Sequence, residues 1–387
     1  MLCALWLLAG AAAQAQGTTV AIGGALQDGN AAVWQRLVQL VQREGRDDPA
    51  ACYHVITLAS GEPAAAAARV QANLARHGGR AVHLQPQEQA PETLARCRGV
   101  YMTGGAQARL LDALLGGPWL AAMHRLHRAG GVVAGSSAGA AVMSGVVFRD
   151  APDVLAVMKG RLREGQEWGR GFGFTPPGLI VDQHAVRRGR MGRLLPLMQA
   201  TATPLGVAVE ENTAALFSGT QIEVLGARGV LIADLSEARP HAGRAFGLSG
   251  GTLHWLESGD RFDLDRRRPE PAARKLAGTR LEPLSPQHRG YHRGRWVYAD
   301  ILAEGMLVAA LQRMVDGDQP ELFGLALAAR PAADDPDPAL AFEWRLWPDA
   351  RTRAWLLTDP EAYTIGGVRF DIVPVAVTQP LTRPLPP

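Results

Sequence analysis

The stretch GGVVAGSSAGAAVMSG, residues 130–145, constrains the fold of this chain more than any other. Its valines predict the end of a buried strand, and the small apolar residues after Ser137 predict the start of a helix. Gly135 and Gly139 flank Ser137 at the G-x-S-x-G spacing of a nucleophile elbow, where a tight turn exposes a serine hydroxyl. Glycine suits both flanks because a Cβ atom there would strike the neighbouring strand or helix. Loops without a catalytic serine also contain this pattern, so the rest of the chain must show whether this stretch is a nucleophile elbow or an ordinary loop.

The segments before the elbow alternate between strand and helix patterns. Short apolar strands are predicted at 18–22, 53–58, 82–84 and 99–103, and helices at 31–43, 63–77 and 108–129. This alternation predicts an α/β fold with a doubly wound, mostly parallel sheet and helices on both faces. Glycine or serine follows each of these strands except 82–84, at the edge where parallel sheets bind ligands.

Two further strands deliver polar residues to the same predicted edge. A strand over 177–181 leads into DQHAVRRGRMGRL, residues 182–194, and a strand over 205–209 leads into Glu210 and Glu211. Residues 213–217, 221–225 and 229–233 then predict a hairpin and one more strand. We therefore expect His184 and Glu211 to lie beside the elbow.

A serine nucleophile requires a base and a group that orients the base. His184 is the expected base because it closes a strand at the catalytic edge. The orienting carboxylate is Glu211, on the next strand, or Asp153, sixteen residues after Ser137. Three other carboxylates stay open as candidates: Asp150, Glu164 and Glu167.

The surrounding residues predict how a substrate is held. The amides of Ala138 and Gly105 are the expected oxyanion donors, and Gln107 could bind a substrate amide. Four arginines follow His184 within a few residues and have no acidic partners at helical spacing: Arg187, Arg188, Arg190 and Arg193. This cluster predicts a pocket for carboxylates, with Asp182 available for a cation such as a guanidinium.

The ends of the chain differ from its middle. Residues 1–16 form an apolar run ending in small residues, which predicts the signal peptide of a periplasmic or extracellular protein; a plain hydrophobic N-terminus is the alternative. A catalytic α/β domain is expected over 17–240 and a smaller accessory α+β region over 241–375. Within the latter, the polar RRRPEPAARK at 266–275 predicts a linker or exposed loop. The proline-rich 376–387 predicts a disordered tail.

Charge and cysteine content limit the expected partners. With 40 Lys and Arg against 37 Asp and Glu, the composition points to no nucleic-acid partner. No stretch after the leader approaches the ~20 apolar residues of a membrane span. No pattern predicts a metal or other cofactor, and a homodimer remains compatible with the sequence. Cys52 and Cys97 could form a disulfide in an exported protein, or they are two free buried thiols.

Five sequence blocks, in this order and spacing, resemble the cyanophycinases of the peptidase S51 group, which also contains aspartyl dipeptidases. The resemblance covers residues 18 to about 235, and its DQH-x3-RGR-x2-RL block is the most specific. The blocks are IGGA (22–25), TGGAQ (103–107), AGSSAGAAVMS (134–144), DQHAVRRGRMGRL (182–194) and GVAVEENTA (206–214).

The resemblance implies a class I glutamine amidotransferase-like fold with serine in place of cysteine as nucleophile. It also implies hydrolysis of cyanophycin, a poly-Asp backbone bearing Arg on each β-carboxyl, to β-Asp-Arg dipeptides. Ser137 would be the nucleophile and His184 the base. The substrate pocket would be lined by Gln107, Asp182, Gln183, Arg188, Arg190 and Arg193.

This chain departs from the family pattern in three respects. Ser136 stands where threonine is usual, the loop containing Asp153 aligns poorly, and the region after residue 240 exceeds the compact cyanophycinases. Two alternatives therefore accompany the cyanophycinase reading: an aspartyl dipeptidase or esterase of the same fold, and a non-catalytic polymer-binding protein.

Overall fold

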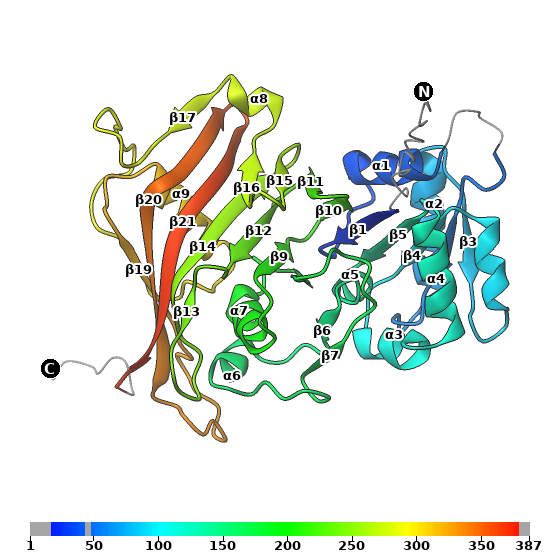
Figure 1. Ribbon diagram of the computed structural model, residues 1–387, viewed down its shortest axis with the longest axis horizontal. Coiled ribbons are helices and arrows are strands. Elements are labelled where there is room, and N and C mark those ends of the chain that lie inside the picture. Colours follow the sequence, from blue (N-terminus) through cyan, green and yellow to red (C-terminus); the bar gives the residue numbers. More distant parts are fainter. Residues whose placement is uncertain (1–16, 43–47, 379–387) are drawn as a thin grey trace, which may run out of the picture.

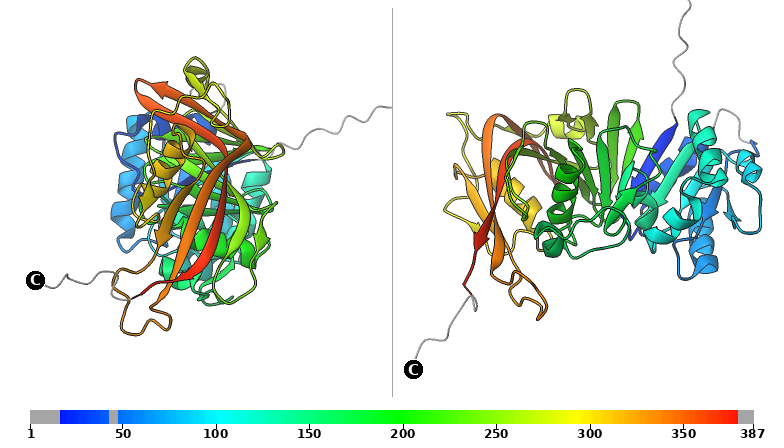
Figure 2. Two further views of the ribbon diagram at one scale, coloured as in Figure 1. Left: turned by 90° about the vertical axis from the view of Figure 1, so that its left-hand side faces the viewer. Right: turned by 60° about the horizontal axis from the view of Figure 1, so that its bottom comes forward.

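The computed structural model describes residues 17–42 and 48–378. In this part of the chain two large β-sheets lie side by side, the first mainly from the N-terminal half and the second mainly from the C-terminal half (Figure 1). Figure 2 shows the same arrangement from two other directions. The predicted signal peptide, 1–16, and most of the predicted tail lie outside the described residues.

The first sheet combines a parallel half with an antiparallel extension. Its strand order is β16-β15-β11-β10-β1-β5-β4-β2-β3, in which β1 to β5 run parallel and the other four strands are antiparallel. The parallel half confirms the predicted α/β fold. The strands are β1 (Thr18–Ile22), β2 (Tyr53–Ile56), β3 (Ala81–Leu84), β4 (Gly99–Met102), β5 (Val132–Ser136), β10 (Thr213–Ser218), β11 (Gln221–Gly226), β15 (Arg261–Asp263) and β16 (Arg268–Glu270).

Helices bury both faces of the parallel strands. Met102 and Val133 pack with α3 and α4, whereas the neighbouring Tyr101 and Ala134 pack with α1 and α2. Successive strand residues point to opposite faces, so this alternation is what a sheet covered on both sides requires. The helices are α1 (Ala31–Val41), α2 (Pro63–Arg76), the 3-10 helix η1 (Pro91–Arg96), α3 (Gln107–Leu114), α4 (Pro118–Arg128) and α5 (Ala138–Ala141).

The single helix predicted over 108–129 is two helices, α3 and α4. Gly116 adopts a φ of +72° and Pro118 begins the second helix. A left-handed glycine followed closely by proline ends one helix and starts another. The break turns the chain before it enters the elbow strand.

The second sheet is largely antiparallel and has the order β18-β19-β20-β21-β14-β12-β9-β8. In addition, β13 pairs with β14 and β17 pairs with β20. The strands are β8 (Leu179–Gln183), β9 (Leu205–Val209), β12 (Gly229–Asp234), β13 (Arg239–Pro240), β14 (Leu248–Glu257), β17 (Thr279–Leu281), β18 (Val297–Tyr298), β19 (Leu322–Ala326), β20 (Leu340–Thr358) and β21 (Glu361–Ala376).

The expectation that β8 and β9 share a sheet with the elbow strand is wrong. They pair in parallel with each other and begin the second sheet. Strand β10 occupies the edge of β1 that they would need, and the β10–β11 hairpin extends the first sheet from there. The residues predicted to meet at the edge of one sheet therefore come from two sheets.

The two sheets pack face to face beside β1. Val207 and Val209 of β9 lie in one buried cluster with Ala215 and Phe217 of β10. Helices α7 and α9 cover the other face of the second sheet. The elements not yet given are β6 (Val146–Phe148), β7 (Trp168–Arg170), α6 (Val154–Met158), α7 (Met191–Ala200), α8 (Ala273–Leu276) and α9 (Met306–Val315).

Strands from both sides of residue 240 share the second sheet. Strand β12 pairs with β14 along its whole length, with Leu231 opposite Trp255. The second sheet therefore includes strands from both predicted domains, 17–240 and 241–375. That each domain folds separately stays a prediction.

The linker expected at 266–275 is wrong, since this stretch contains β16 and the start of α8. Lys275 is buried there, and its Nζ donates to Asp260 at 2.8 Å. This buried ion pair anchors the end of the segment, while Arg266 and Arg268 stay exposed, and the polar composition alone does not reveal the anchor.

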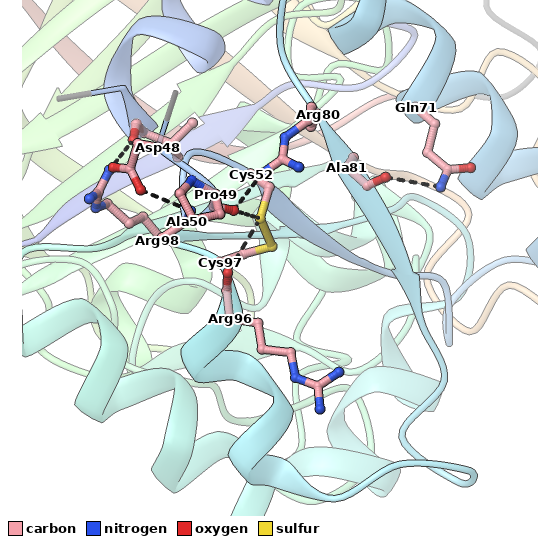
Figure 3. Close-up of a disulfide and its surroundings, with 11 residues drawn as sticks. Asp48, Pro49, Ala50, Cys52, Gln71, Arg80, Ala81, Arg96, Cys97 and Arg98 are labelled. Carbon is pink, nitrogen blue, oxygen red and sulfur yellow. Dashed lines mark hydrogen bonds and ion pairs between the residues drawn. A yellow bond between two sulfur atoms is a disulfide. The ribbon is translucent and has the colours of Figure 1, made fainter. Parts of the chain in front are cut away.

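A disulfide joins Cys52, just before β2, to Cys97, just before β4 (Figure 3). Strands β2 and β4 are neighbours in the first sheet, so the two Cα atoms lie only 4.9 Å apart. The sequence left open whether these cysteines pair. The strand order decides it, because no third strand separates them.

Candidate active site

Ser137 occupies a strained turn between β5 and α5. Its φ is +53° and its ψ is −113°, and its amide donates to the carbonyl oxygen of Ile22 at 2.9 Å. A Cβ atom at Gly135 would lie 2.4 Å from the oxygen of Gly139, and one at Gly139 would lie 2.2 Å from the oxygen of Met102. Both glycines of the motif are therefore required by close backbone contacts, as the sequence predicts.

His184 reaches Ser137 from the second sheet, directly after β8. Its Nε2 lies 2.9 Å from Ser137 Oγ, which donates a hydrogen bond to it. The backbone of His184 also has a positive φ, +51°, and its amide donates to the oxygen of Gly23 at 2.9 Å. A Cβ atom at Gly24 would lie 2.3 Å from Nε2, so the β1 turn leaves just enough room for the ring.

Glu211 orients the ring of His184. It follows β9, the strand parallel to β8, and its Oε1 lies 2.6 Å from His184 Nδ1. A carboxylate only accepts, so Nδ1 carries the proton and Nε2 is left to accept from the serine. Asp153, the alternative, instead accepts from an amide in the first turn of α6 at 2.8 Å. Glu167 is bound by arginine side chains and Asp150 by a neighbouring amide.

Burial keeps the ring neutral at physiological pH. Desolvation lowers the pKa of His184 below its usual value, the hydrogen bond to Glu211 opposes this shift, and the charges of Arg188 and Arg190 add to it. A neutral imidazole at pH 7 can accept a proton from a hydroxyl, which is what a general base must do.

Glu210, to which the sequence pattern assigned no role, holds the turn after His184. Its side chain is buried, and Oε2 accepts from the amides of Val186 at 2.5 Å and Arg187 at 3.0 Å. A Cβ atom at Gly23 would lie 2.0 Å from the oxygen of Glu210. The two carboxylates after β9 therefore have different contacts: Glu210 binds the turn after His184, and Glu211 contacts the ring of His184.

Asn212 is a second residue that the pattern missed. Its Oδ1 accepts from the amide of Gln27 at 3.0 Å and from Asn30 Nδ2 at 2.8 Å, which ties the loop after β9 to the loop before α1. Its φ is +56°. An Asn directly after two strand-ending carboxylates is a signal for such a turn, because Asn tolerates the left-handed region.

The arginine cluster predicted as one pocket is divided between surface and interior. Arg193 forms two hydrogen bonds with Asp182, at 2.7 and 2.6 Å, and both side chains are almost fully buried. Arg190 is also buried and donates to the carbonyl oxygen of Gln183 at 2.8 Å. These contacts brace β8 and the turn after it against α7, and the place of these four residues in a substrate pocket stays a prediction.

Arg187 and Arg188 are exposed beside the serine and histidine. Residues 184–190 form a turn and α7 begins only at Met191, so the four arginines do not share a helix face. Arg187 Nε lies 3.6 Å from Glu211 Oε2. Arg188 is thus the arginine of the predicted substrate pocket that solvent reaches.

The remaining predicted residues follow strands of the first sheet. Gln107 is buried, and its Nε2 donates to the carbonyl oxygens of Phe148 at 2.9 Å and Asp150 at 3.0 Å, so it braces the chain after β6. Gly104 lies against Ser137, where a Cβ atom would be 3.1 Å from the serine Cβ. Gly105, the predicted oxyanion donor, follows with a φ of +137°. Ala138 begins α5 on the other side of the serine.

Within residues 17–42 and 48–378 no three His, Cys, Asp or Glu side chains gather as a metal site would require. The same residues include no helix long and apolar enough to cross a membrane.

The model of peptidase family S51 matches residues 20–225, more than half of the chain. The chain belongs to peptidase family S51. The S51 region includes β1, the elbow, His184 and Glu211, and it ends at β11. The rest of the second sheet, from β12 onward, lies outside the family match.

Proteins named cyanophycinase are similar to about half of this chain. Cyanophycinase from Nostoc sp. is 35% identical over 202 residues, 49% of this chain and 64% of its own length. Cyanophycinase from Geminocystis herdmanii is 31% identical over 191 residues, 46% of this chain and 66% of its own length. The chain therefore aligns with slightly less than two thirds of each of these relatives.

Among solved structures, a peptidase from an acI-B1 Actinobacterium aligns over 65% of this chain and 98% of its own, with 18% identity and a TM-score of 0.49. A putative peptidase E protein from Listeria monocytogenes aligns over 55% of this chain, with 12% identity and a TM-score of 0.39.

Proposed function

We propose that this S51 chain is a serine peptidase that hydrolyses cyanophycin to β-Asp-Arg dipeptides through an acyl-enzyme on Ser137. The observation that carries the proposal is the hydrogen-bonded series from Ser137 Oγ through His184 to Glu211, at 2.9 and 2.6 Å. The relatives named cyanophycinase supply the substrate class.

The reaction follows from the direction of these hydrogen bonds. As Ser137 Oγ attacks the scissile carbonyl carbon, His184 Nε2 takes its proton, and Glu211 stabilises the resulting imidazolium. The negative oxygen of the tetrahedral intermediate lies between the amides of Gly105 and Ala138. The imidazolium then protonates the leaving amine, and water repeats the sequence to release the acyl group from the serine.

The polymer carries a carboxylate and a guanidinium on every unit. Arg188, exposed beside His184, suits a substrate carboxylate because a guanidinium pairs with it in a fixed planar geometry. The buried Asp182–Arg193 pair supports this turn from the interior.

Incubation of purified cyanophycin with wild type and Ser137→Ala, followed by mass spectrometry of the soluble products, tests the proposal. We expect β-Asp-Arg from the wild type and a loss of at least about 10³-fold in the variant. Release at the same rate from both proteins would overturn the mechanism. Binding of the polymer by wild type without any product would identify a non-catalytic polymer-binding protein.

Glu211→Gln tests the third member of the series. The amide cannot hold the required tautomer of His184, so we expect kcat to fall by up to about 10⁴-fold. Asp153→Asn, at the α6 cap, is the matched control and should retain activity. The opposite ranking of the two variants would reassign the acid to Asp153.

We also propose that the protein is exported. The apolar run of residues 1–16 supports a leader, and the disulfide between Cys52 and Cys97 suits an oxidising compartment. Fractionation of the producing cells, with mass determination of the mature N-terminus, tests this. A cytoplasmic protein that retains residues 1–16 would contradict it.

A further inference from the structure

A second cavity, of about 860 Å³, lies between the two sheets. Its walls come from the turn before β16, from the end of β12, and from β14, β20 and β21. Figure 1 shows β16 beside β14 and β21 at this place. The volume falls within the range of small-ligand sites, roughly 300–1,000 Å³.

The cavity is separate from the serine, histidine and glutamate. Asp234 in its wall ends β12 opposite Leu205, the first residue of β9. Glu211 follows the other end of β9. Strands rise about 3.3 Å per residue, so this part of the wall is on the order of 15 Å from the catalytic edge.

Positive charge dominates the cavity wall. Three carboxylates face five arginines there, and Arg267 pairs with Asp234 at 3.0 Å. Arg268, at the start of β16, forms no ion pair with any residue of 17–42 or 48–378. The other four arginines pair with carboxylates, among them Arg353 with Glu282 at 3.5 Å, so Arg268 is the unpaired guanidinium group of this wall among the described residues. A guanidinium fork suits a carboxylate. The five arginines are Arg266, Arg267, Arg268, Arg351 and Arg353.

One of these arginines has an uncommon backbone conformation. Arg267 has a φ of +51°. Among the other described non-glycine residues with positive φ, Ala202 lies in the turn after α7, and the rest lie at the candidate active site: Ala25, Ser137, His184 and Asn212. Strained residues of this kind cluster at functional sites because the surrounding structure must maintain them. On the opposite wall, a register shift in β20 just before Arg353 bends the strand that carries it.

A buried donor in the wall also lacks an acceptor. His254 Nδ1 accepts from the amide of Gly367 at 3.2 Å, and burial lowers the pKa of His254 to about 4. The neutral ring therefore carries its proton on Nε2, which has no hydrogen-bond partner among the described residues. Leaving a buried donor unpaired is costly, and an anionic ligand would supply the missing acceptor nearby.

We propose that this cavity binds carboxylates of a second stretch of the aspartyl polymer while Ser137 acts on another part of the same chain. The inference rests on the proposed function. Arg268 would pair with the α-carboxylate of one arginyl side group, and Arg353 would pair with a second one in place of Glu282. Trp355, also in the wall, would stack on their guanidinium groups.

The distance between the cavity and Ser137 determines how long a substrate must be to occupy both sites. An extended chain spans at most about 3.6 Å per residue, so about five or more backbone units are needed to reach both sites. Holding one stretch raises the effective concentration of the rest at Ser137. A two-unit peptide, (β-Asp-Arg)₂, cannot use this advantage.

Cosedimentation with insoluble cyanophycin in a Ser137→Ala background tests the binding directly. We expect Arg268→Glu and Arg353→Glu to weaken polymer binding by about 10-fold each. Arg128→Glu is the matched control, because this arginine is exposed, forms no ion pair among the described residues and lies at the end of α4, outside the cavity wall. Unfolding midpoints establish that every variant is folded.

With Ser137 restored, kinetics separate the second site from catalysis. We expect the ratio of kcat/KM for the polymer to kcat/KM for (β-Asp-Arg)₂ to fall about 10-fold in Arg268→Glu, mainly through KM, and to stay constant in Arg128→Glu. Equal binding and equal ratios in the two variants would overturn the second site even if hydrolysis depends on Ser137. Loss of binding in Arg268→Glu, with no Ser137-dependent product from wild type, would instead refute the proposed function and leave the binding site standing.

Discussion

Gly24 is the residue whose missing Cβ atom leaves room for the ring of His184. It lies in the turn after β1, with a φ of +100°, and a Cβ atom there would lie 2.3 Å from both Cε1 and Nε2 of His184. Neither the backbone nor the ring leaves space for a methyl group. The position of the imidazole is therefore set in part by a residue that contributes no chemistry.

Gly24→Ala should displace the ring of His184 from Ser137 and lower kcat by at least about 10²-fold, since small misplacements of reacting groups carry penalties of that size. Gly29→Ala is the control, because a Cβ atom at Gly29 meets nothing within 4 Å. Steady-state kinetics, with circular dichroism to establish folding, measure the effect. Equal activities in the two variants would contradict the assigned position of the ring.

The pKa of His184 determines the acid limb of the pH profile. Burial lowers this pKa below its usual value near 6.5, and Arg188 lowers it further. Since the neutral ring is the active form, kcat/KM should rise with pH through an apparent pKa below about 6.5 and level off near neutrality. Arg188→Ala removes a positive charge, so the limb should move to higher pH. A limb that stays in place or moves to lower pH would contradict this electrostatic account.

Strands β2 and β4 illustrate how one crosslink secures part of a sheet. The bond between Cys52 and Cys97 closes a loop with a sequence separation of 45. It lies just before both strands, at the edge opposite to the elbow, so it stabilises the parallel half without approaching the serine.

Replacing both cysteines by serine should lower the free energy of unfolding by about 2–4 kcal/mol, because the open loop gains entropy in the unfolded chain. Urea unfolding of wild type and the Cys52→Ser/Cys97→Ser variant measures this. Reductant should lower the stability of wild type and leave the double variant unchanged. Equal stabilities would mean that the two thiols are not joined in the folded protein.

The molecule as a whole is organised by the junction of its two sheets. Ser137 comes from the first sheet, His184 and Glu211 come from loops that follow strands of the second, and the turn after β1 bonds to both. Strand β12 lies between β9 and β14, so the region after residue 240 supports the strands that precede His184 and Glu211.

A fragment that ends at residue 240 should therefore fail to fold cooperatively. It lacks β14, and it would expose the buried face of β12 that includes Leu231 and Ala233. Thermal unfolding and dye binding of residues 17–240, compared with 17–387, test this. A cooperative transition with Ser137-dependent hydrolysis in the shorter fragment would establish the catalytic domain predicted from the sequence.

The sequence by itself determined the local features. Gly135, Ser137 and Gly139 specify the elbow because the need for glycine is a property of a few neighbouring residues. Strand and helix patterns likewise predicted the parallel half of the first sheet. Even the helix break at Gly116 was readable in principle, since glycine and proline act on their own backbone.

Only the tertiary structure decided which residues meet. Strand pairing joins distant segments, so no local pattern shows that β10 takes the edge of β1 and sends β8 and β9 into a second sheet. The same packing buried Arg193 against Asp182 and left Arg188 in solvent, although all three lie in one sequence block. The sequence around a charged residue does not show whether its side chain is exposed or buried in an ion pair. The residues that bury it and pair with it come from distant parts of the chain.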